Sequence, residues 1–254
     1  MMKIKGVDLS YCQEGISFPA LKQAGVKFAI IRAGFSTKKD VTMGKFVADC
    51  KKYVIDYGFY WYSYAMSVEQ AEAEAKKCIS VIKGLSPTYP VFFDMEEKKQ
   101  ISGLSTDTRT KMAIAFCEKI RQAGFKPGVY ANPSFMENYY DKSRIVGRYD
   151  IWLAHWTNSP DRLPKYNYGQ SMWQWGVDKI DGYDVDGDIC FTEYGKKKPV
   201  EKTIDQLADE VLAGKWDNGA ERERLLTAAG YDYNAVQKRV NEKLYKKTVD
   251  EIAV

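Results

Sequence analysis

Short apolar runs alternate with longer amphipathic stretches over the first 195 residues of the chain. The apolar runs are typical of strands, because they are short and rich in β-branched and aromatic residues. The predicted strands are Ile4–Val7, Phe28–Ile31, Gly58–Tyr64, Val91–Phe93, Gly128–Tyr130, Ile151–Ala154 and Met172–Trp175.

The stretches between the first strands are predicted to be helical. Ser67-Val68-Glu69-Gln70 forms a capping box at the start of one helix, and a second runs from Thr106 to Ala123, where Gly124 ends it. Strands that alternate with helices indicate a parallel sheet, and this many units favour a closed barrel. From Ile151 to Ile189 the segments are short and rich in Trp, without room for helices. We therefore expect an α/β barrel whose last part is β-only.

A polar, basic break at Gly195–Pro199 separates this pattern from a purely helical one. A capping box at Thr203–Gln206 begins the first of three predicted helices, and the others span Ala220–Ala229 and Tyr233–Leu244. Such a bundle is small for independent stability, which favours a binding module. The predicted organisation is a catalytic barrel at 1–195, a linker at 196–202, a three-helix module at 203–246 and a tail at 247–254.

Composition narrows the function classes. No window of 18 or more apolar residues predicts a membrane span, and the first ten residues lack the apolar centre of a signal peptide. The net charge of +4 is mixed along the chain, which argues against nucleic-acid binding. The five cysteines form no CxxC pair, so we expect free thiols. His155 is the single histidine, so a zinc site and a Ser or Cys nucleophile with a histidine base are both disfavoured; we expect His155 to be structural or a rim contact.

Acidic residues follow three of the predicted strands. In VFFDMEE, Asp94 and Glu96 stand two residues apart after an apolar strand and therefore share a face. Asp8 follows the first strand, and the segment Asp184–Asp188 supplies acids to the last. Because the carboxyl ends of parallel barrel strands meet at one edge, these acids are predicted to converge. Glu97 to Lys99 are interpreted as a solvated loop. For Asp184 and Asp188, a loop or turn position is the alternative to a catalytic role.

Carboxylates gathered in one pocket raise each other's pKa values, so that one donates a proton while another stays ionised. This is the equipment for cleaving a glycosidic bond. Aromatic residues at strand ends, whose flat faces can stack on sugar rings, support that interpretation, and Trp156 is among them. The predicted substrate-binding residues are Arg32, Trp61, Tyr62, Tyr64, Tyr130, Trp152, Trp173 and Trp175.

A metal site is the main alternative. Asp8, Asp94, Glu96 and Asp186 are oxygen ligands that would equally suit Mg²⁺ or Ca²⁺. The chain has no glycine-rich phosphate loop and no H-x-x-H pattern. A metal-dependent hydrolase on the same barrel therefore stays open.

The chain resembles glycoside hydrolase family 25, the Chalaropsis-type lysozymes that are common among phage endolysins. The resemblance covers nearly all of residues 3–194, in family order. The matching segments are GVDLSYCQ from Gly6, FAIIRAG from Phe28, GFYWYSYA from Gly58, PVFFDMEE from Pro90, PGVYAN from Pro127, IWLAHW from Ile151, MWQW from Met172 and YDVDGD from Tyr183.

The resemblance implies an irregular (β/α)5(β)3 barrel and an N-acetylmuramidase that cuts the β-1,4 bond from N-acetylmuramic acid to N-acetylglucosamine, without a cofactor. It implies that Glu96 is the general acid and that Asp94 stabilises the substrate's acetamido group, which acts as internal nucleophile. Asp8 and Asp186 would hold the geometry of this pair, with Asp188 as the alternative last acid. Many members have a histidine in the strand where this chain has Trp61, so the resemblance does not extend to that histidine's contact.

The tail LADEVLAGKWDNGAERERLLTAAGYDYNAVQKRVN, from Leu207, is similar to a three-helix cell-wall-binding repeat of phage lysins. This similarity implies a peptidoglycan partner, with no nucleic acid and no membrane insertion, and an endolysin that accumulates in the host cytoplasm before acting on the wall. A single copy implies weak binding unless the protein self-associates. A stabilising appendage, a catalytically silent wall-binding protein and a chitinase are the remaining alternatives.

Overall fold

The computed structural model describes residues 2–194, 202–228 and 231–252. The chain divides into two compact units, Met1–Gly195 and Lys196–Val254. Apart from Lys202, the predicted linker lies outside the described residues. In the described parts, no helix is both long enough and apolar enough to cross a membrane.

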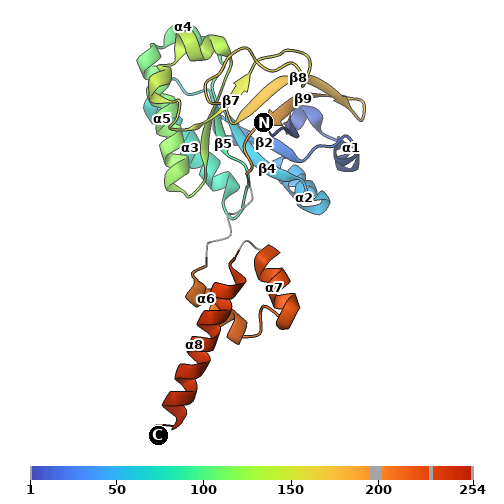
Figure 1. The fold of residues 1–254 in the computed structure, drawn as a ribbon. Coiled ribbons are helices and arrows are strands. Elements are labelled where there is room, and N and C mark those ends of the chain that lie inside the picture. The colour runs from blue at the N-terminus through green and yellow to red at the C-terminus, as the bar shows by residue number, and fades with distance from the viewer. Residues whose placement is uncertain (1, 195–201, 229–230, 253–254) are drawn as a thin grey trace. The chain divides into compact units, whose positions relative to one another are not determined.

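Eight strands close into a barrel in the first unit (Figure 1). Seven of them are parallel, and the eighth, β9, runs antiparallel between β8 and β1 and closes the ring. The two-residue strand β3 pairs with β2 outside the ring. The strands are β1 Ile4–Leu9, β2 Phe28–Phe35, β3 Lys38–Lys39, β4 Asp56–Tyr62, β5 Val91–Asp94, β6 Pro127–Ala131, β7 Asp150–Ala154, β8 Met172–Ile180 and β9 Tyr183–Cys190.

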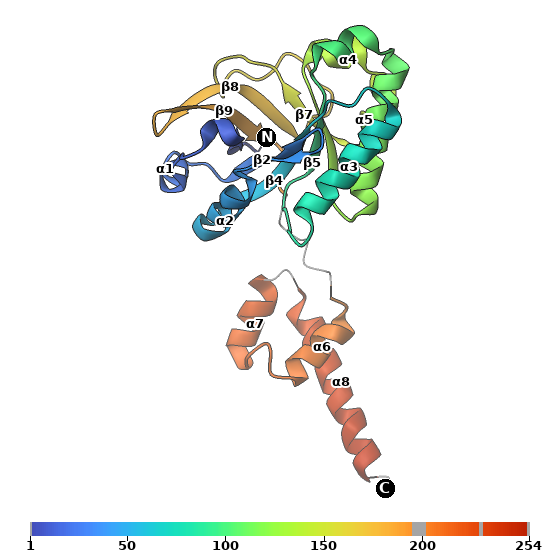
Figure 2. The same ribbon diagram turned by 180° about the vertical axis from the view of Figure 1, so that it is seen from behind.

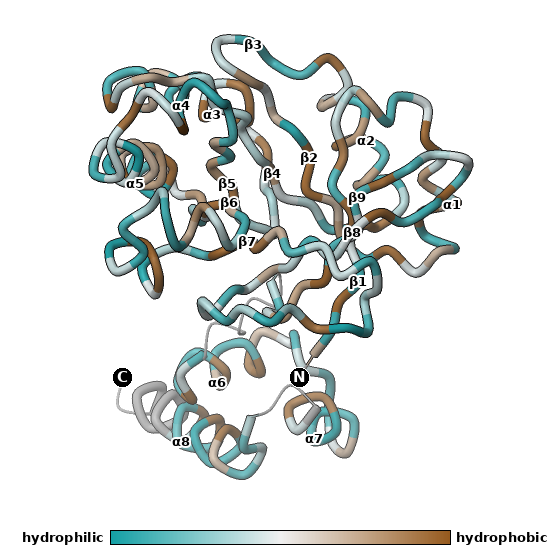
Figure 3. The backbone as a smooth tube through the Cα atoms, turned by 90° about the horizontal axis from the view of Figure 1, so that it is seen from above, coloured by the Kyte–Doolittle hydropathy of each residue, from teal (hydrophilic) through white to brown (hydrophobic). Residues whose placement is uncertain are grey.

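Helices cover the outside of the ring, with α3, α4 and α5 on one side and α1 and α2 on the other (Figures 2 and 3). After β6 the helical segment shrinks to a π-helical turn and a 3-10 turn, and residues 155–182 contain no helix. This order confirms the predicted (β/α)5(β)3 barrel with a β-only ending. The helical elements are η1 Tyr11–Gln13, α1 Phe18–Gln23, α2 Met43–Tyr53, α3 Val68–Ile82, α4 Lys98–Gly103, α5 Thr106–Gln122, η2 Phe135–Tyr139 and η3 Lys142–Arg144.

Alternate residues of each strand face opposite sides of the barrel wall. One apolar cluster takes side chains from strands all around the ring, which can meet only in the interior; it includes Phe28, Tyr60, Phe92, Trp152 and Met172. A larger cluster joins the other face of the strands to the helices. Both faces of the barrel strands are therefore buried, as is usual for parallel sheets.

Two local predictions need correction. The acidic segment at residues 184–188 is not a turn after the last strand, because it lies within β9 and pairs with β8 and β1. Lys98 and Lys99 are exposed but begin α4, and Glu97 is the N-cap of that helix in a reciprocal capping box with Gln100. The five cysteines are free, as predicted; Cys12 is exposed and the other four are buried.

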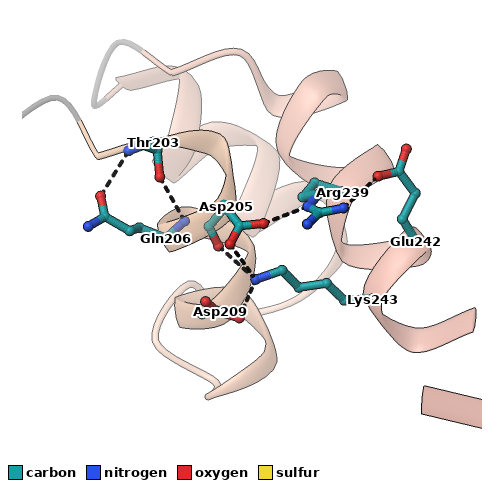
Figure 4. A network of polar contacts seen from close by, with 7 residues as sticks. All are labelled: Thr203, Asp205, Gln206, Asp209, Arg239, Glu242 and Lys243. Carbon is teal, nitrogen blue, oxygen red and sulfur yellow. Dashed lines mark hydrogen bonds and ion pairs between the residues drawn. The ribbon is translucent and has the colours of Figure 1, made fainter. Parts of the chain in front are cut away.

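The second unit has three helices: α6 Ile204–Leu212, α7 Gly219–Ala228 and α8 Tyr233–Ile252. They pack around Leu207, Val211, Leu226, Val236 and Val240. The capping box at Thr203 is present as predicted, whereas α8 continues past its predicted end at residue 244. Ion pairs join α6 to α8: Arg239 contacts Asp205 at 2.6 Å, and Lys243 contacts Asp209 at 2.6 Å (Figure 4).

Candidate active site

The predicted acids lie at the mouth of the barrel, the edge formed by the carboxyl ends of its parallel strands. Asp8 comes from β1, Asp94 is the last residue of β5, and Glu96 stands two residues beyond it. Asp186 comes from the first half of β9, which starts at this edge because β9 is antiparallel. Asp8 and Asp94 are buried, whereas Glu96 and Asp186 are partly exposed.

Burial and mutual repulsion raise the pKa values of these acids. Burial raises the pKa of Glu96, and the charges of Asp186 and Glu97 raise it further. Burial, then Glu96 and Asp8, raise the pKa of Asp94 well above its ordinary value, against the opposing effect of Arg32. A raised pKa lets a carboxyl group hold its proton up to a higher pH, which is the property that a general acid needs.

Asp188, also on β9, lies at the bottom of this acid group. It is completely buried, and Trp152 Nε1 donates a hydrogen bond to its Oδ1 at 2.7 Å. Burial and the charge of Asp8 raise the pKa of Asp188 well above its ordinary value. Asp186 is the one of the two β9 acids that is partly exposed, and its charge raises the pKa of Glu96. Of the two acids of β9, only Asp186 is therefore accessible from the mouth.

Gln174, on β8, connects Asp8 to two aromatic residues. Its Nε2 donates to Asp8 Oδ2 at 2.8 Å, and its Oε1 accepts from Tyr130 Oη at 3.1 Å and from Trp156 Nε1 at 3.0 Å. Asp8 and Gln174 are 166 residues apart in the chain. Sequence reasoning did not single out Gln174, because no local pattern signals a contact at this separation.

Arg32 lies beside the mouth and is held in place by the buried side chain of Asp40. Its Nε and Nη2 both contact Asp40 Oδ2 at 2.7 Å, and its guanidinium lies 4.6 Å from the centre of the Tyr11 ring. Asp40 is almost fully buried and also accepts from Thr42. The charge of Arg32 lowers the pKa of Asp94, which favours its ionised form.

A small hollow of about 140 Å³ opens beside these residues. Tyr64 in it is exposed, whereas Tyr62 is partly buried and donates a hydrogen bond to Glu97 Oε1 at 3.0 Å. The predicted substrate-binding residues Arg32, Tyr62 and Tyr64 therefore line one concave surface. Its lining residues are Tyr11, Arg32, Phe35, Tyr62 and Tyr64.

Four of the predicted sugar-stacking residues are buried, and this part of the prediction is wrong. Trp61 and Trp173 are 0% exposed, Trp152 is 1% exposed and Trp175 is 6% exposed. Trp61 packs between the strands and the helices, and Trp173 and Trp175 form a separate cluster with Ile189. Trp152 lies inside the barrel below the acids. None of these indole faces is open to a sugar.

The exposed indole at the site belongs to Trp156, which is 54% exposed on the segment after β7. Tyr130 lies inside the mouth, partly exposed, with its ring centre 4.6 Å from that of Trp152. His155 is partly buried and contacts Tyr166, and its backbone accepts from Trp173 Nε1. These contacts are compatible with the predicted structural or rim role, and burial lowers the pKa of His155.

A buried polar network supports the loop that carries Glu96. Gln100 Nε2 donates to the backbone oxygens of Ser63 and Ala65, at 3.1 and 2.8 Å, and ties the end of β4 to α4. Arg109 of α5 donates to the backbone oxygens of Gln100 and Ile101, both at 3.0 Å. Its other acceptors are the backbone oxygens of Leu104 and Tyr139 and the hydroxyl of Thr106.

Metal ligation was the alternative role for the acids. Within the part of the chain that the structure describes, no three His, Cys, Asp or Glu side chains are grouped so that they could hold a metal ion. The side chains of the mouth do fit proton transfer, because carboxyl groups of different burial and exposure lie beside aromatic and amide groups.

Residues 7–183 match the family described as glycosyl hydrolases family 25. The chain belongs to this family. Residues 205–244 match the CW_7 repeat, so the resemblances noted for the barrel and for the helical tail are both confirmed.

Relatives of this family member share the barrel. The lysozyme of Streptococcus phage Cp-7 is 28% identical over 193 residues, which are 73% of this chain and 55% of that protein. A probable GH family 25 lysozyme of Dictyostelium discoideum is 26% identical over 74% of this chain and 86% of its own length. The modular autolysin LytC of Streptococcus pneumoniae, solved in complex with a synthetic peptidoglycan ligand, is 25% identical with a TM-score of 0.64, over 74% of this chain and 46% of that one. The chain thus spans about half the length of the phage lysozyme and of LytC.

Proposed function

We propose that this protein is a peptidoglycan hydrolase that cleaves the β-1,4 bond between N-acetylmuramic acid and N-acetylglucosamine. The observation that carries the proposal is the group of carboxyl side chains from β1, β5 and β9 at the mouth of a family 25 barrel. The relatives, two lysozymes and an autolysin solved with a peptidoglycan ligand, support this substrate class.

In the proposed reaction, Glu96 acts first as general acid. Its proton passes to the glycosidic oxygen as the bond to the anomeric carbon breaks, and the carbonyl oxygen of the substrate's own acetamido group forms a new bond to that carbon. Asp94 accepts from the acetamido N–H and stabilises the positive charge that develops on the ring. Glu96, now ionised, takes a proton from a water molecule, whose oxygen bonds to the anomeric carbon as the bond from that carbon to the acetamido oxygen breaks. This assisted route is a known exception to the two-carboxylate scheme.

The remaining acids have supporting roles in this proposal. Asp186 raises the pKa of Glu96 and so helps it to hold its proton until substrate binds, and Asp8 raises the pKa of Asp94. Arg32 favours ionised Asp94. We also assign Arg32, Tyr62, Tyr64 and Tyr130 to substrate binding, because they line the mouth or the hollow beside it.

Reducing-end analysis of digested peptidoglycan tests the proposal. Purified wall is incubated with the protein, reduced with borohydride and analysed by mass spectrometry. We expect reduced N-acetylmuramic acid at the new chain ends, unchanged by EDTA. Reduced N-acetylglucosamine would identify a glucosaminidase instead, activity on chitin alone would identify a chitinase, and loss of activity in EDTA would support the metal-dependent alternative. No new ends, with normal wall binding, would favour a silent binding protein.

We further propose that the helical unit binds the glycan part of peptidoglycan, as its match to the CW_7 repeat suggests. Deleting residues 200–254 is expected to weaken binding to intact wall about tenfold or more, because the barrel alone then supplies the contacts. Turnover of soluble glycan fragments should stay within about twofold, since these substrates need no anchoring. Pull-down with purified wall measures the first quantity, and equal wall affinity after truncation would refute the role.

A further inference from the structure

The rim residue Trp156 has a polar contact that stacking on a sugar does not require. Its ring is 54% exposed, yet its Nε1 donates at 3.0 Å to Oε1 of Gln174, a side chain that is only 3% exposed. Gln174 Nε2 in turn donates to Asp8 Oδ2 at 2.8 Å. An exposed aromatic residue is thus two hydrogen bonds away from a buried acid of the site.

The indole settles which way the amide of Gln174 points. An indole N–H is a donor only, so the atom that meets Trp156 has to be the amide oxygen. The amide nitrogen must then face Asp8. The hydroxyl of Tyr130, which also contacts Oε1 at 3.1 Å, can either donate or accept and therefore does not settle the orientation by itself.

The orientation matters because Asp8 is surrounded by groups that disfavour its charge. Burial raises the pKa of Asp8 well above its ordinary value, the charges of Asp186 and Glu96 add to this, and the hydrogen bond from Gln174 opposes it. A reversed amide would place a second oxygen against the carboxylate, which only a protonated Asp8 could satisfy. The titratable groups around Asp8 are Asp186 and Asp188 of β9, Asp94 and Glu96 of the β5 end, Tyr60 of β4 and Tyr130 of β6.

We propose that Trp156 is a positioning residue that acts through Gln174: its indole N–H fixes the amide so that Asp8 receives a hydrogen bond, which favours the ionised form of this acid. The inference rests on the proposed glycosidase function. It assigns to Trp156 a role that depends on its nitrogen, in addition to the flat face that it offers to a sugar.

Replacing Trp156 by Phe separates the two roles, because the ring stays and the N–H is lost. The pH profile of kcat on soluble glycan fragments is the measurement. Loss of the fixed hydrogen bond raises the pKa of Asp8, so the acid limb of the profile should move upward by about one pH unit. On the acid side of the profile, kcat of Trp156→Phe should be about tenfold lower than kcat of the unchanged enzyme. Its KM should stay within about twofold.

Trp175→Phe is the matched control. Trp175 follows Gln174 on the same strand, is 6% exposed, and its Nε1 has no hydrogen-bond partner. The same substitution there should leave the acid limb where it is. Trp156→Ala, which removes the ring as well, should move the limb and also raise KM.

Failure of the proposed Trp156 role and failure of the proposed glycosidase function give different results. An acid limb in Trp156→Phe that coincides with that of the unchanged enzyme would overturn the inference, as would an equal shift in Trp175→Phe. If the unchanged protein releases no muramic acid reducing ends, the proposed function fails before the variants are compared.

Discussion

Glu96→Gln is expected to lower turnover of soluble peptidoglycan fragments by about a thousandfold, within the range that a general acid contributes. A glutamine amide has nearly the same shape but cannot give up a proton to the leaving oxygen. The raised pKa of Glu96, caused by burial and by the charges of Asp186 and Glu97, is the property that the substitution removes.

The fold and wall binding should survive this change. Like a protonated Glu96, a glutamine amide is uncharged, so the substitution adds no repulsion with Asp186 or Asp94. The thermal midpoint should be equal or higher, and pull-down with purified wall should be unchanged. Glu97→Gln is the matched control, because Glu97 is the next residue and caps α4. It should lower turnover far less, and full activity of Glu96→Gln would refute the mechanism.

The fold could be predicted from the sequence because each strand or helix is signalled by the hydrophobic pattern of residues that are close together in the chain. The seven predicted strands all exist, and the absence of helix-length segments after Ile151 correctly predicted the β-only ending. Asp8 and Asp94 were accessible for the same reason, since each ends an apolar run and the carboxyl ends of parallel strands share one edge. The strand β9 was not recognised, because its acids interrupt the apolar pattern.

The tryptophans that were wrongly predicted to bind sugar show a limit of the hydrophobic pattern: it does not predict which face of a strand lines the barrel. A period of two says that Trp61 and Phe59 share a face of β4 and that Tyr60 and Tyr62 share the other. It does not say which face lines the barrel when both are apolar and buried. In the structure Tyr60 and Tyr62 face the interior cluster, and Trp61 faces the helices.

Contacts between distant segments were also inaccessible. Gln174 and Arg109 look like ordinary polar residues of a strand and a helix, and their partners are known only once the chain is folded. Sequence spacing signals neither geometry: Gln174 of β8 meets Asp8 of β1 past the intervening strand β9, and Arg109 meets backbone oxygens of α4 and of Tyr139.

Arg109→Met should cause the largest loss of stability among single substitutions near the site. Arg109 is 4% exposed, and it donates to the backbone oxygens of Gln100, Ile101 and Tyr139, each at 3.0 Å. Methionine fills a similar volume but donates nothing. Each buried carbonyl oxygen left without a partner costs about 1–3 kcal/mol, so we expect a loss of about 4 kcal/mol in the free energy of unfolding of the barrel unit.

For a unit of this size, that loss corresponds to a thermal midpoint lower by about 10 °C. Arg144→Met is the matched control, because Arg144 contacts Asp107 at 2.9 Å in an exposed ion pair, which contributes little. Its midpoint should change by about 2 °C or less. Turnover of Arg109→Met should also fall at temperatures where the barrel is still folded, since the α4 oxygens that Arg109 holds belong to the segment that follows Glu96 directly. Equal midpoints for the two variants would mean that the α4 segment finds other donors, and that the position of Glu96 does not depend on Arg109.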